Sequence, residues 1–350
     1  MVFVKREYTV RFTTPAFLGD AQQRAQWRTP PFKHLLRAWW RIAYAMKREF
    51  AVDLNHMRRE EGRLFGAAAS SSDSSKSLVR LRLSSWKSGS MKAWPRKDPR
   101  VKHPDVHGGN LPVGSHLYLG YGPLEFVKHN GTQLKNKPAI GTDERQVLHL
   151  AFPEADAPML DQALSWCHLF GSVGGRCRNG WGSLSLEGRE GSPDMNVALP
   201  LRQWMACFLE DEEWPHAIGH DAVGPLIWVT RPHADWQSLM ETLARLKIGL
   251  RTQFPFKGGN YVPVAEDRHW LAYPVTNHSV RGWGSYRLPN TLRFKVRQCE
   301  GRKVVGVIVH IPHAPPEKTR SDKDRIKMIR VWQKVHNFLD LEESLERSQR

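Results

Sequence analysis

The chain has 350 residues, enough for about two domains of ordinary size, and 40% of its residues are hydrophobic, so we expect buried cores. Lysine and arginine number 52 against 35 aspartates and glutamates, a formal net charge of +17, which favours a polyanionic partner such as nucleic acid over a small neutral substrate. No apolar run is long enough to span a membrane and no signal-peptide core is visible. The 4 cysteines form no Cys-x-x-Cys pair, which indicates neither a disulfide scaffold nor a zinc knuckle. We therefore expect a cytoplasmic protein with no membrane partner and no cofactor.

The first half predicts a mixed sheet-and-helix unit. Residues 7–13 alternate and are rich in β-formers, which predicts a strand ending at Thr14-Pro15. A helix follows, with Thr29 as its N-cap and Pro30 in its first position. Its apolar residues recur at helical spacing and predict a buried face: Phe32, Leu35, Leu36, Trp39, Trp40 and Ala43. Further strands are predicted over 78–83, 117–127, 146–152 and 182–187, with a helix over 159–170. This order matches a ferredoxin-like unit.

Two stretches inside this unit do not fit a core. Residues 67–77 are mostly Ala and Ser, typical of a flexible loop. Residues 86–105 interleave Trp86 and Trp94 with basic side chains, which suits either a nucleic-acid arm or a solvated insertion. The basic residues of this stretch are Lys87, Lys92, Arg96, Lys97, Arg100 and Lys102.

The second half is less regular. We place the domain boundary within 188–200, which gives domains over 1–190 and 198–350. Strands are predicted over 204–209 and 226–230, a helix over 236–250, and a hairpin over 291–298 and 303–311. A long amphipathic helix closes the chain, with Ser321 and Asp324 as a capping pair. These elements suggest another ferredoxin-like unit, although the pattern does not place its last strand.

A glycine-rich loop over 171–183 is the strongest functional signal. It reads Gly-Ser-Val-Gly-Gly-Arg-Cys-Arg-Asn-Gly-Trp-Gly-Ser, and a short version returns as Arg281-Gly-Trp-Gly-Ser285. Glycines permit positive φ and close approach to a ligand, so N–H groups can face a phosphate while arginines neutralise it and an indole offers a stacking face. An ordinary tight turn is the alternative.

Three segments together carry a family resemblance: Thr14-Pro-Ala-Phe-Leu-Gly19, the run Arg28 to Arg41 with Leu64-Phe-Gly66, and the glycine loop. They resemble the RAMP superfamily of CRISPR proteins, specifically the two-RAMP-domain subunit of type III-B (Cmr) effector complexes. The resemblance implies an α+β protein of two tandem ferredoxin-like (RRM-like, RAMP) domains with a glycine-rich loop and basic insertions. It also implies a non-catalytic subunit that binds the 3′ region of a guide RNA and the paired target RNA, beside other Cmr effector subunits, in antiviral defence.

The expected RNA contacts lie on the helix, the loops and the basic insertion. Lys33, Arg37 and Arg41 recur every four residues, so they could follow a phosphate strand, or form a solvated basic face. Trp181 could stack on a base or fill a core. In the glycine loop we expect contacts from Gly174, Gly175, Arg176, Arg178, Asn179, Gly180, Trp181 and Gly182. Elsewhere we expect contacts from Lys87, Lys92, Arg96, Lys97, Arg281 and Trp283.

An endoribonuclease of the same superfamily is the main alternative, because a histidine can act as general base on a 2′-hydroxyl. His34 and Asp20 are the candidates, each weak as a lone group. The pairs His103/His107 and His216/His220 have i,i+4 spacing for a metal, but Pro104 and Gly219 argue against helices there. We therefore expect no catalytic residue and no metal site. A protein-interaction module whose charge serves only solubility is a further alternative.

Overall fold

The computed structural model describes residues 1–67, 74–106, 111–188, 192–319 and 321–349. Its two main sheets are four-stranded and antiparallel, in the orders β2-β7-β1-β8 and β14-β15-β11-β16. Each order is that of a ferredoxin-like unit, in which the third strand of the unit pairs with both the first and the second. The predicted α+β architecture of two tandem ferredoxin-like units is therefore confirmed.

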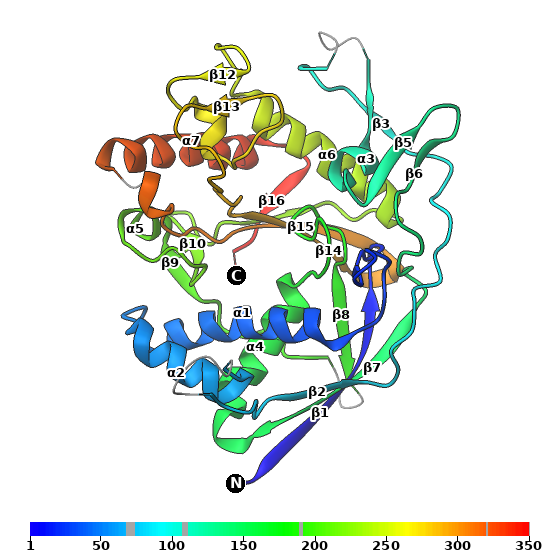
Figure 1. Cartoon of the computed structure of the whole chain (residues 1–350), viewed down its shortest axis with the longest axis vertical. Helices are drawn as coiled ribbons and strands as arrows, with labels where there is room; N and C mark the ends of the chain where they lie inside the picture. Colours follow the sequence, from blue (N-terminus) through cyan, green and yellow to red (C-terminus); the bar gives the residue numbers. More distant parts are fainter. Residues whose placement is uncertain (68–73, 107–110, 189–191, 320, 350) are drawn as a thin grey trace.

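The first unit contains β1, α1, β2, β7, α4 and β8 in chain order (Figure 1). Their bounds are β1 Phe3–Phe12, α1 Thr29–Lys47, β2 Arg80–Leu83, β7 Arg145–Pro153, α4 Ala157–Phe170 and β8 Leu184–Gly188. A further helix, α2 (Leu54–Phe65), packs beside α1 and is capped by Asp53, whose carboxylate accepts from the N–H groups of Asn55 and His56. The apolar stripe of α1 is buried as predicted, with Trp39 and Trp40 almost fully inaccessible.

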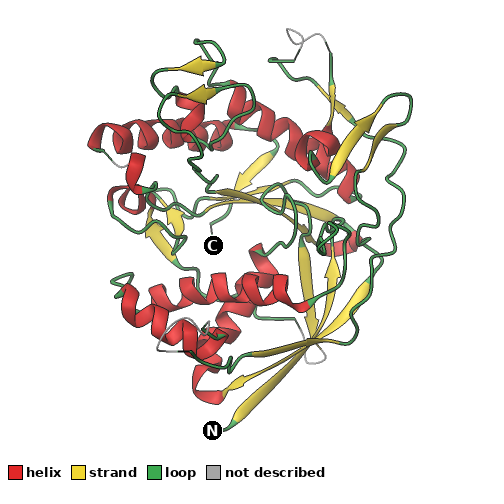
Figure 2. Ribbon diagram, viewed as in Figure 1, coloured by secondary structure: helices red, strands yellow, loops and turns green. Residues whose placement is uncertain are grey.

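The second unit repeats the pattern with β11, α6, β14, β15, α7 and β16 (Figure 2). Their bounds are β11 Ile227–Thr230, α6 Trp236–Thr252, β14 Leu292–Gln298, β15 Val304–His310, α7 Asp322–Leu341 and β16 Leu345–Arg347. Ser321 caps α7 by accepting from the N–H of Asp324, as predicted. The last strand, which the sequence pattern did not place, is β16. It is only 3 residues long and therefore shows no alternation that a sequence pattern could reveal.

The two units stack in four layers. Figure 1 shows α1 and α4 between the two sheets, with α6 and α7 on the far side of the second sheet. The strand β15 explains this, because Val307 and Val309 join the core of the first unit while Val304 and Ile308 join the core under α6 and α7. The second sheet is thus covered on both faces, whereas the described residues cover the first sheet on one face.

The remaining elements are short and lie outside the two ferredoxin-like units. The insertion between β2 and β7 holds β3 (Arg100–Val101), β4 (Val113–Gly114), α3 (Ser115–Gly120), β5 (Leu124–Val127) and β6 (Gly131–Leu134). Between the two units lie β9 (Leu201–Gln203), α5 (Trp204–Leu209) and β10 (Ile218–His220). The pair β12 (Tyr261–Val262) and β13 (Ser279–Val280) follows α6, and short 3-10 turns cover 154–156, 267–270, 300–302 and 317–319. Within the described residues no helix is long and apolar enough to cross a membrane.

Three local predictions are wrong. Residues 117–120 belong to helix α3, so only the later part of the predicted 117–127 strand is extended. Residues 204–209 form helix α5, started by the Gln203 side chain, which accepts from the N–H groups of Met205 and Ala206. The side chain of Thr29 does not cap α1, because that helix begins at Thr29 with Arg28 before it. Most of the predicted 67–77 loop lies outside the described residues.

Candidate nucleic-acid interface

The three sequence segments that carry the family resemblance meet at one cavity of about 430 Å³. The first segment contributes Phe17, Leu18 and Gly19, and the start of α1 contributes Arg28 and Pro31. The glycine loop contributes Gly174 and Gly175. The rest of the wall is formed by Gln23, Ala25, Gly122, Pro123, Asn136 and Pro138. Segments that are far apart in the sequence thus form one site.

The glycines of the loop are required first because two stretches of the main chain approach each other closely there. Gly174 has φ +94, and a Cβ there would lie 2.6 Å from the carbonyl oxygen of Phe17. The next N–H, of Gly175, donates to that same oxygen at 2.9 Å. A Cβ on Gly182, at φ +62, would lie 2.0 Å from the oxygen of Val173. A side chain at Gly174 would displace the loop from the 14–19 segment, and a side chain at Gly182 would separate the two ends of the loop.

The middle of the loop keeps its hydrogen-bonding capacity. The main-chain N–H groups of Gly174, Arg176, Cys177 and Arg178 donate to nothing in the described part of the chain. Gly174 and Arg176 have positive φ, of +94 and +57, a conformation that occurs in the backbone nests that bind anions. The side chains of Arg176 and Arg178 are exposed, and Arg176 Nε donates to the oxygen of Tyr121 at 2.6 Å. This part of the loop has the donors and the charge that a phosphate requires.

Asn179 and Gly180 face the protein interior. Asn179 Nδ2 donates to the oxygen of Leu119 at 2.7 Å, and its Oδ1 accepts from Lys247 Nζ on α6. A Cβ on Gly180 would lie 3.4 Å from Met240 Sδ, also on α6. The amide of Asn179 thus holds the loop against the insertion and the second unit, and its predicted contact with RNA stays a prediction.

The tryptophans of both glycine motifs are core residues. Trp181 is fully buried, with its ring 5.3 Å from that of Trp94 and 5.8 Å from that of Trp236. Trp283 is 9% exposed and packs edge-on against Tyr273 at 4.8 Å. The core role therefore applies to Trp181, and neither indole offers a free face for a base. Trp94 is buried as well, so within 86–105 only Trp86, 56% exposed, remains available for stacking.

A buried lysine, Lys295, and a half-buried one, Lys247, lie beneath the loop. Lys295 Nζ, on β14, donates to the carbonyl oxygens of Gly171 and Leu184, which flank the loop. Burial lowers the pKa of Lys295 to about 7, and burial together with Arg251 and Arg176 lowers the pKa of Lys247 to about 7. Two main-chain N–H groups of β14 complete the attachment. The N–H of Phe294 donates to the carbonyl oxygen of Arg178 at 3.0 Å, and the N–H of Val296 donates to the side-chain Oγ of Ser183 at 2.9 Å.

The basic face of α1 is paired within the protein. Arg37 Nε donates to Glu61 Oε1 at 2.6 Å, and Arg41 donates to both oxygens of the same carboxylate. The Glu61 side chain is 5% exposed; burial opposes its ionisation, but the hydrogen bonds from both arginines prevail and lower its pKa. Lys33 Nζ bonds Ser77 Oγ at 2.9 Å. This face therefore has less free charge than the sequence suggests, although both guanidinium groups remain partly exposed.

The other predicted contacts lie at the surface. The side chains of Lys87, Lys92, Arg96 and Lys97 are all exposed, on the insertion between β2 and β7. Arg281 is exposed and lies 6.0 Å from the ring centroid of Tyr261. The second glycine motif thus lies on the loops after α6 and is not a wall of the cavity.

The nuclease candidates do not assemble. His34 is exposed on α1, and the Asp20 carboxylate is used by a turn, where it accepts from the N–H groups of Gln22 and Arg24. His216 is buried and bonds Arg202, while His107 lies outside the described residues. In the described ranges no group of three or more His, Cys, Asp or Glu side chains is placed to hold a metal.

Sequence reasoning missed Arg28 and Asn136 as site residues. Arg28 donates to the oxygen of Gly19 at 2.6 Å, and its Nε is buried without a partner in the described structure. Arg28 is the first residue of the Arg28 to Arg41 segment, so the sequence did hold a signal for it. Asn136 lies in an insertion with no motif, so only the folded chain brings it to the cavity.

No protein-family model and no curated protein matches the chain. Among solved structures, the chain is similar to Cmr1 from Pyrococcus furiosus, with 14% identity and a TM-score of 0.44 over 92% of each chain. It is also similar to a chain of the Type III-B Cmr-beta structure bound to cognate target RNA, with 11% identity and a TM-score of 0.47, covering 96% of this chain and 100% of that one.

Proposed function

We propose that the chain is a non-catalytic RNA-binding subunit of a type III-B CRISPR effector complex. In this proposal it contacts the 3′ region of the guide RNA and the paired target, beside other Cmr effector subunits, in the cytoplasm. One observation carries the proposal most: the three resembling segments converge on one cavity, and the glycine loop that contributes Gly174 and Gly175 to it also holds the exposed Arg176 and unpaired N–H groups. The excess of positive charge supports it further.

Binding to single-stranded RNA tests the proposal. The variant Arg176→Ala with Arg178→Ala removes the exposed loop cations, while the buried attachments through Lys295 and Asn179 stay. The slope of log K against log salt should shrink by about 1.4, because each phosphate contact on a single strand contributes about 0.7. Fluorescence anisotropy of a labelled 20-nucleotide oligouridine, measured over a salt series, gives this slope.

The matched control is Lys323→Ala with Arg330→Ala on α7, which removes the same charge from exposed positions in the layer farthest from the first sheet. A control that loses as much slope as the loop variant would contradict a localised site. Specific RNA cleavage by the purified chain, abolished by His34→Ala, would instead support the endoribonuclease alternative. Guide-length RNA co-purifying with the chain and its partner subunits is the expected cellular counterpart.

A further inference from the structure

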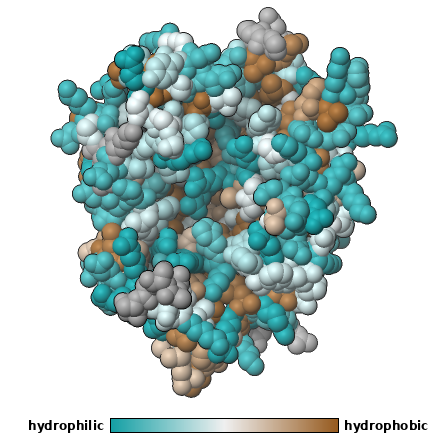
Figure 3. Space-filling model, in the orientation of Figure 1, coloured by the Kyte–Doolittle hydropathy of each residue, from teal (hydrophilic) through white to brown (hydrophobic). Residues whose placement is uncertain are grey.

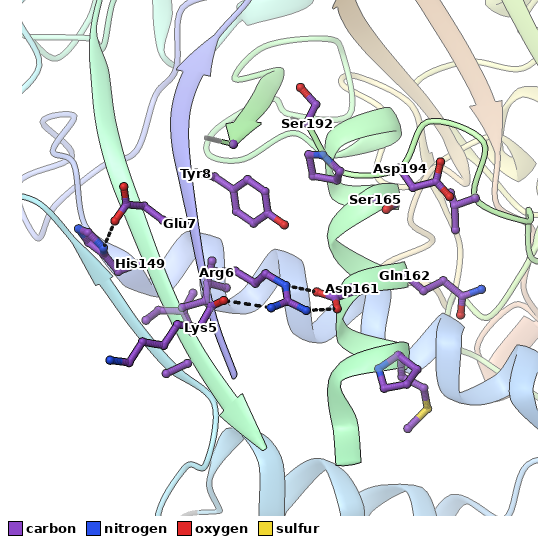
Figure 4. A pocket seen from close by; sticks show the side chains of 18 of the residues that line it. Lys5, Arg6, Glu7, Tyr8, His149, Asp161, Gln162, Ser165, Ser192 and Asp194 are labelled. Atoms are coloured by element: carbon purple, nitrogen blue, oxygen red, sulfur yellow. Dashed lines mark hydrogen bonds and ion pairs between the residues drawn. The ribbon is translucent and has the colours of Figure 1, made fainter. Parts of the chain in front are cut away.

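The first sheet has an open face. The side chains of Tyr8, Val10 and Phe12 point from β1 into the core with α1 and α4. The intervening residues of β1 point the other way, because side chains alternate across a strand. Figure 4 shows this division: Arg6 and Tyr8 point toward α4, whereas Lys5, Glu7 and His149 lie on the opposite side of the strands. The second sheet has no such face, because the first unit covers it.

The open face is rich in arginine. Its exposed or half-buried residues come from every strand of the sheet: Phe3, Lys5, Glu7, Thr9 and Arg11 of β1; Arg145, Val147, His149 and Ala151 of β7; Arg80 and Arg82 of β2; and Ser185 and Glu187 of β8. Both carboxylates are already engaged. Glu7 bonds His149 at 3.1 Å, and Glu187 bonds Arg11 at 2.8 Å. We refer to this surface below as the outer sheet face.

Several cations on the outer sheet face remain unpaired. Lys5, Arg82 and Arg145 are exposed and have no ion pair with any described residue. Arg80 is exposed and has no ion pair with a described residue, and its guanidinium lies 5.1 Å from the ring centroid of Phe3. The register aligns these residues in rows across the strands, with Arg80 opposite Ala151 and Arg82 opposite His149. Ala151, which has a small side chain, lies between Lys5 and Arg80 in this register.

The chemistry favours RNA over an acidic protein. Most of the cations are arginines, whose planar donors match phosphate oxygens in pairs. A flat, open four-stranded sheet is a surface on which single-stranded RNA is bound in other ferredoxin-like proteins, with an aromatic ring as a platform. Here Phe3 and Arg80 supply that ring and its cation.

The outer sheet face also continues from the glycine loop. The loop ends at Ser183, whose carbonyl oxygen accepts from the N–H of Thr13, and β8 begins at the next residue. Arg11 pairs in register with Ser185 and with Arg145, so the first cations of the face follow the loop directly. The distance from Arg11 to Lys5 along β1 is six residues, or roughly 20 Å at about 3.3 Å per residue.

We propose that the outer sheet face is a second RNA-binding surface, which carries a single strand onward from the glycine loop. The proposal rests on the RNA-binding function proposed above, but it concerns a different set of side chains. The strand would run from Arg145 past Arg82 to Arg80 and Phe3, with its phosphates on these three arginines.

Removing charge from the outer sheet face and from the glycine loop in separate variants tests this inference apart from the RNA-binding function proposed above. The variant Arg80→Ala with Arg82→Ala should leave the fold intact, because both side chains are exposed and neither has an ion pair within the described residues. With a labelled 20-nucleotide oligouridine, the salt slope should fall by about 1.4 relative to the parent chain. Combined with the loop variant, the losses should add, since the two pairs contact different phosphates. The α7 variant, Lys323→Ala with Arg330→Ala, is again the control.

Each outcome decides one question. A parental slope for the Arg80/Arg82 variant, with a reduced slope for the loop variant, would overturn the outer sheet face and leave the proposed function standing. Failure of the parent chain itself to bind RNA would overturn both. Normal RNA binding by the Arg80/Arg82 variant, with failure to assemble with partner subunits, would identify the face as a protein-docking surface and overturn this inference. Ultraviolet crosslinking of 4-thiouridine RNA to a peptide containing Phe3 would support it independently.

Discussion

At the scale of single residues, the charged groups divide into those that hold the protein together and those that remain free. Arg37 and Arg41 share the buried carboxylate of Glu61, while Arg176 and Arg178 stay exposed. Periodicity along α1 correctly predicted which face carries the cations. It could not reveal the pairing, because Glu61 comes from α2 and only the packing of the two helices brings it there.

The pairing predicts that Arg37→Ala with Arg41→Ala is destabilising. Glu61 would be left in a buried site without a partner, and an unsatisfied buried group of this kind costs about 1–3 kcal/mol. Urea denaturation followed by circular dichroism measures the loss in free energy of unfolding. Adding Glu61→Gln should recover part of that loss, since the uncompensated charge disappears. An unchanged urea midpoint in the double variant would show that water already satisfies the carboxylate.

At the scale of elements, the glycine loop attaches the first unit to the second and is also a candidate RNA site. Its flanks accept from Lys295 of β14, and its Asn179 bonds Lys247 of α6. The glycine pattern indicated positive φ correctly, as Gly174, Gly180 and Gly182 show. It could not tell whether the close approach was to a phosphate or to the chain itself. For Gly180 the neighbour is α6, so Gly180→Val tests the fold rather than RNA binding.

Lys295 and Lys247 give stability a dependence on pH. The pKa of Lys295 is about 7 in the folded chain against 10.5 for an ordinary lysine, so between these pH values the unfolded chain binds more protons. Stability should therefore rise with pH from about 7 toward 10, by up to about 1.4 kcal/mol per pH unit for each such lysine. Thermal unfolding of Lys295→Met across this range should show a shallower rise than the parent, with Lys247 supplying the remainder. Identical slopes would mean that Lys295 is charged in the folded chain.

At the scale of the whole molecule, the insertion and the two units share their cores. Trp94 of the insertion packs against Trp181 of the glycine loop and Trp236 of α6, with centroids 5.3 Å and 5.9 Å apart. The order of strands and helices predicted two ferredoxin-like units correctly, since each unit has its own alternating pattern. How the two units stack could not be predicted. A strand buried on both faces, such as β15, has an apolar sequence that does not reveal which elements cover each face.

This shared core predicts that the two domains expected from the sequence, 1–190 and 198–350, do not fold independently. Expressed alone, each would expose a large apolar face: the first unit loses the cover that Val307 and Val309 give its core, and the second loses Trp181 and Trp94 from under α6. Each fragment alone should aggregate or bind a hydrophobic dye, whereas co-expressed fragments should co-purify as one complex. In that complex Trp94→Ala should weaken association, because removing a buried tryptophan costs about 3–5 kcal/mol. Trp86→Ala is the matched control, since the Trp86 side chain is 56% exposed and should leave association unchanged. Two soluble, separately folded fragments that do not associate would show that the layers meet without mutual dependence.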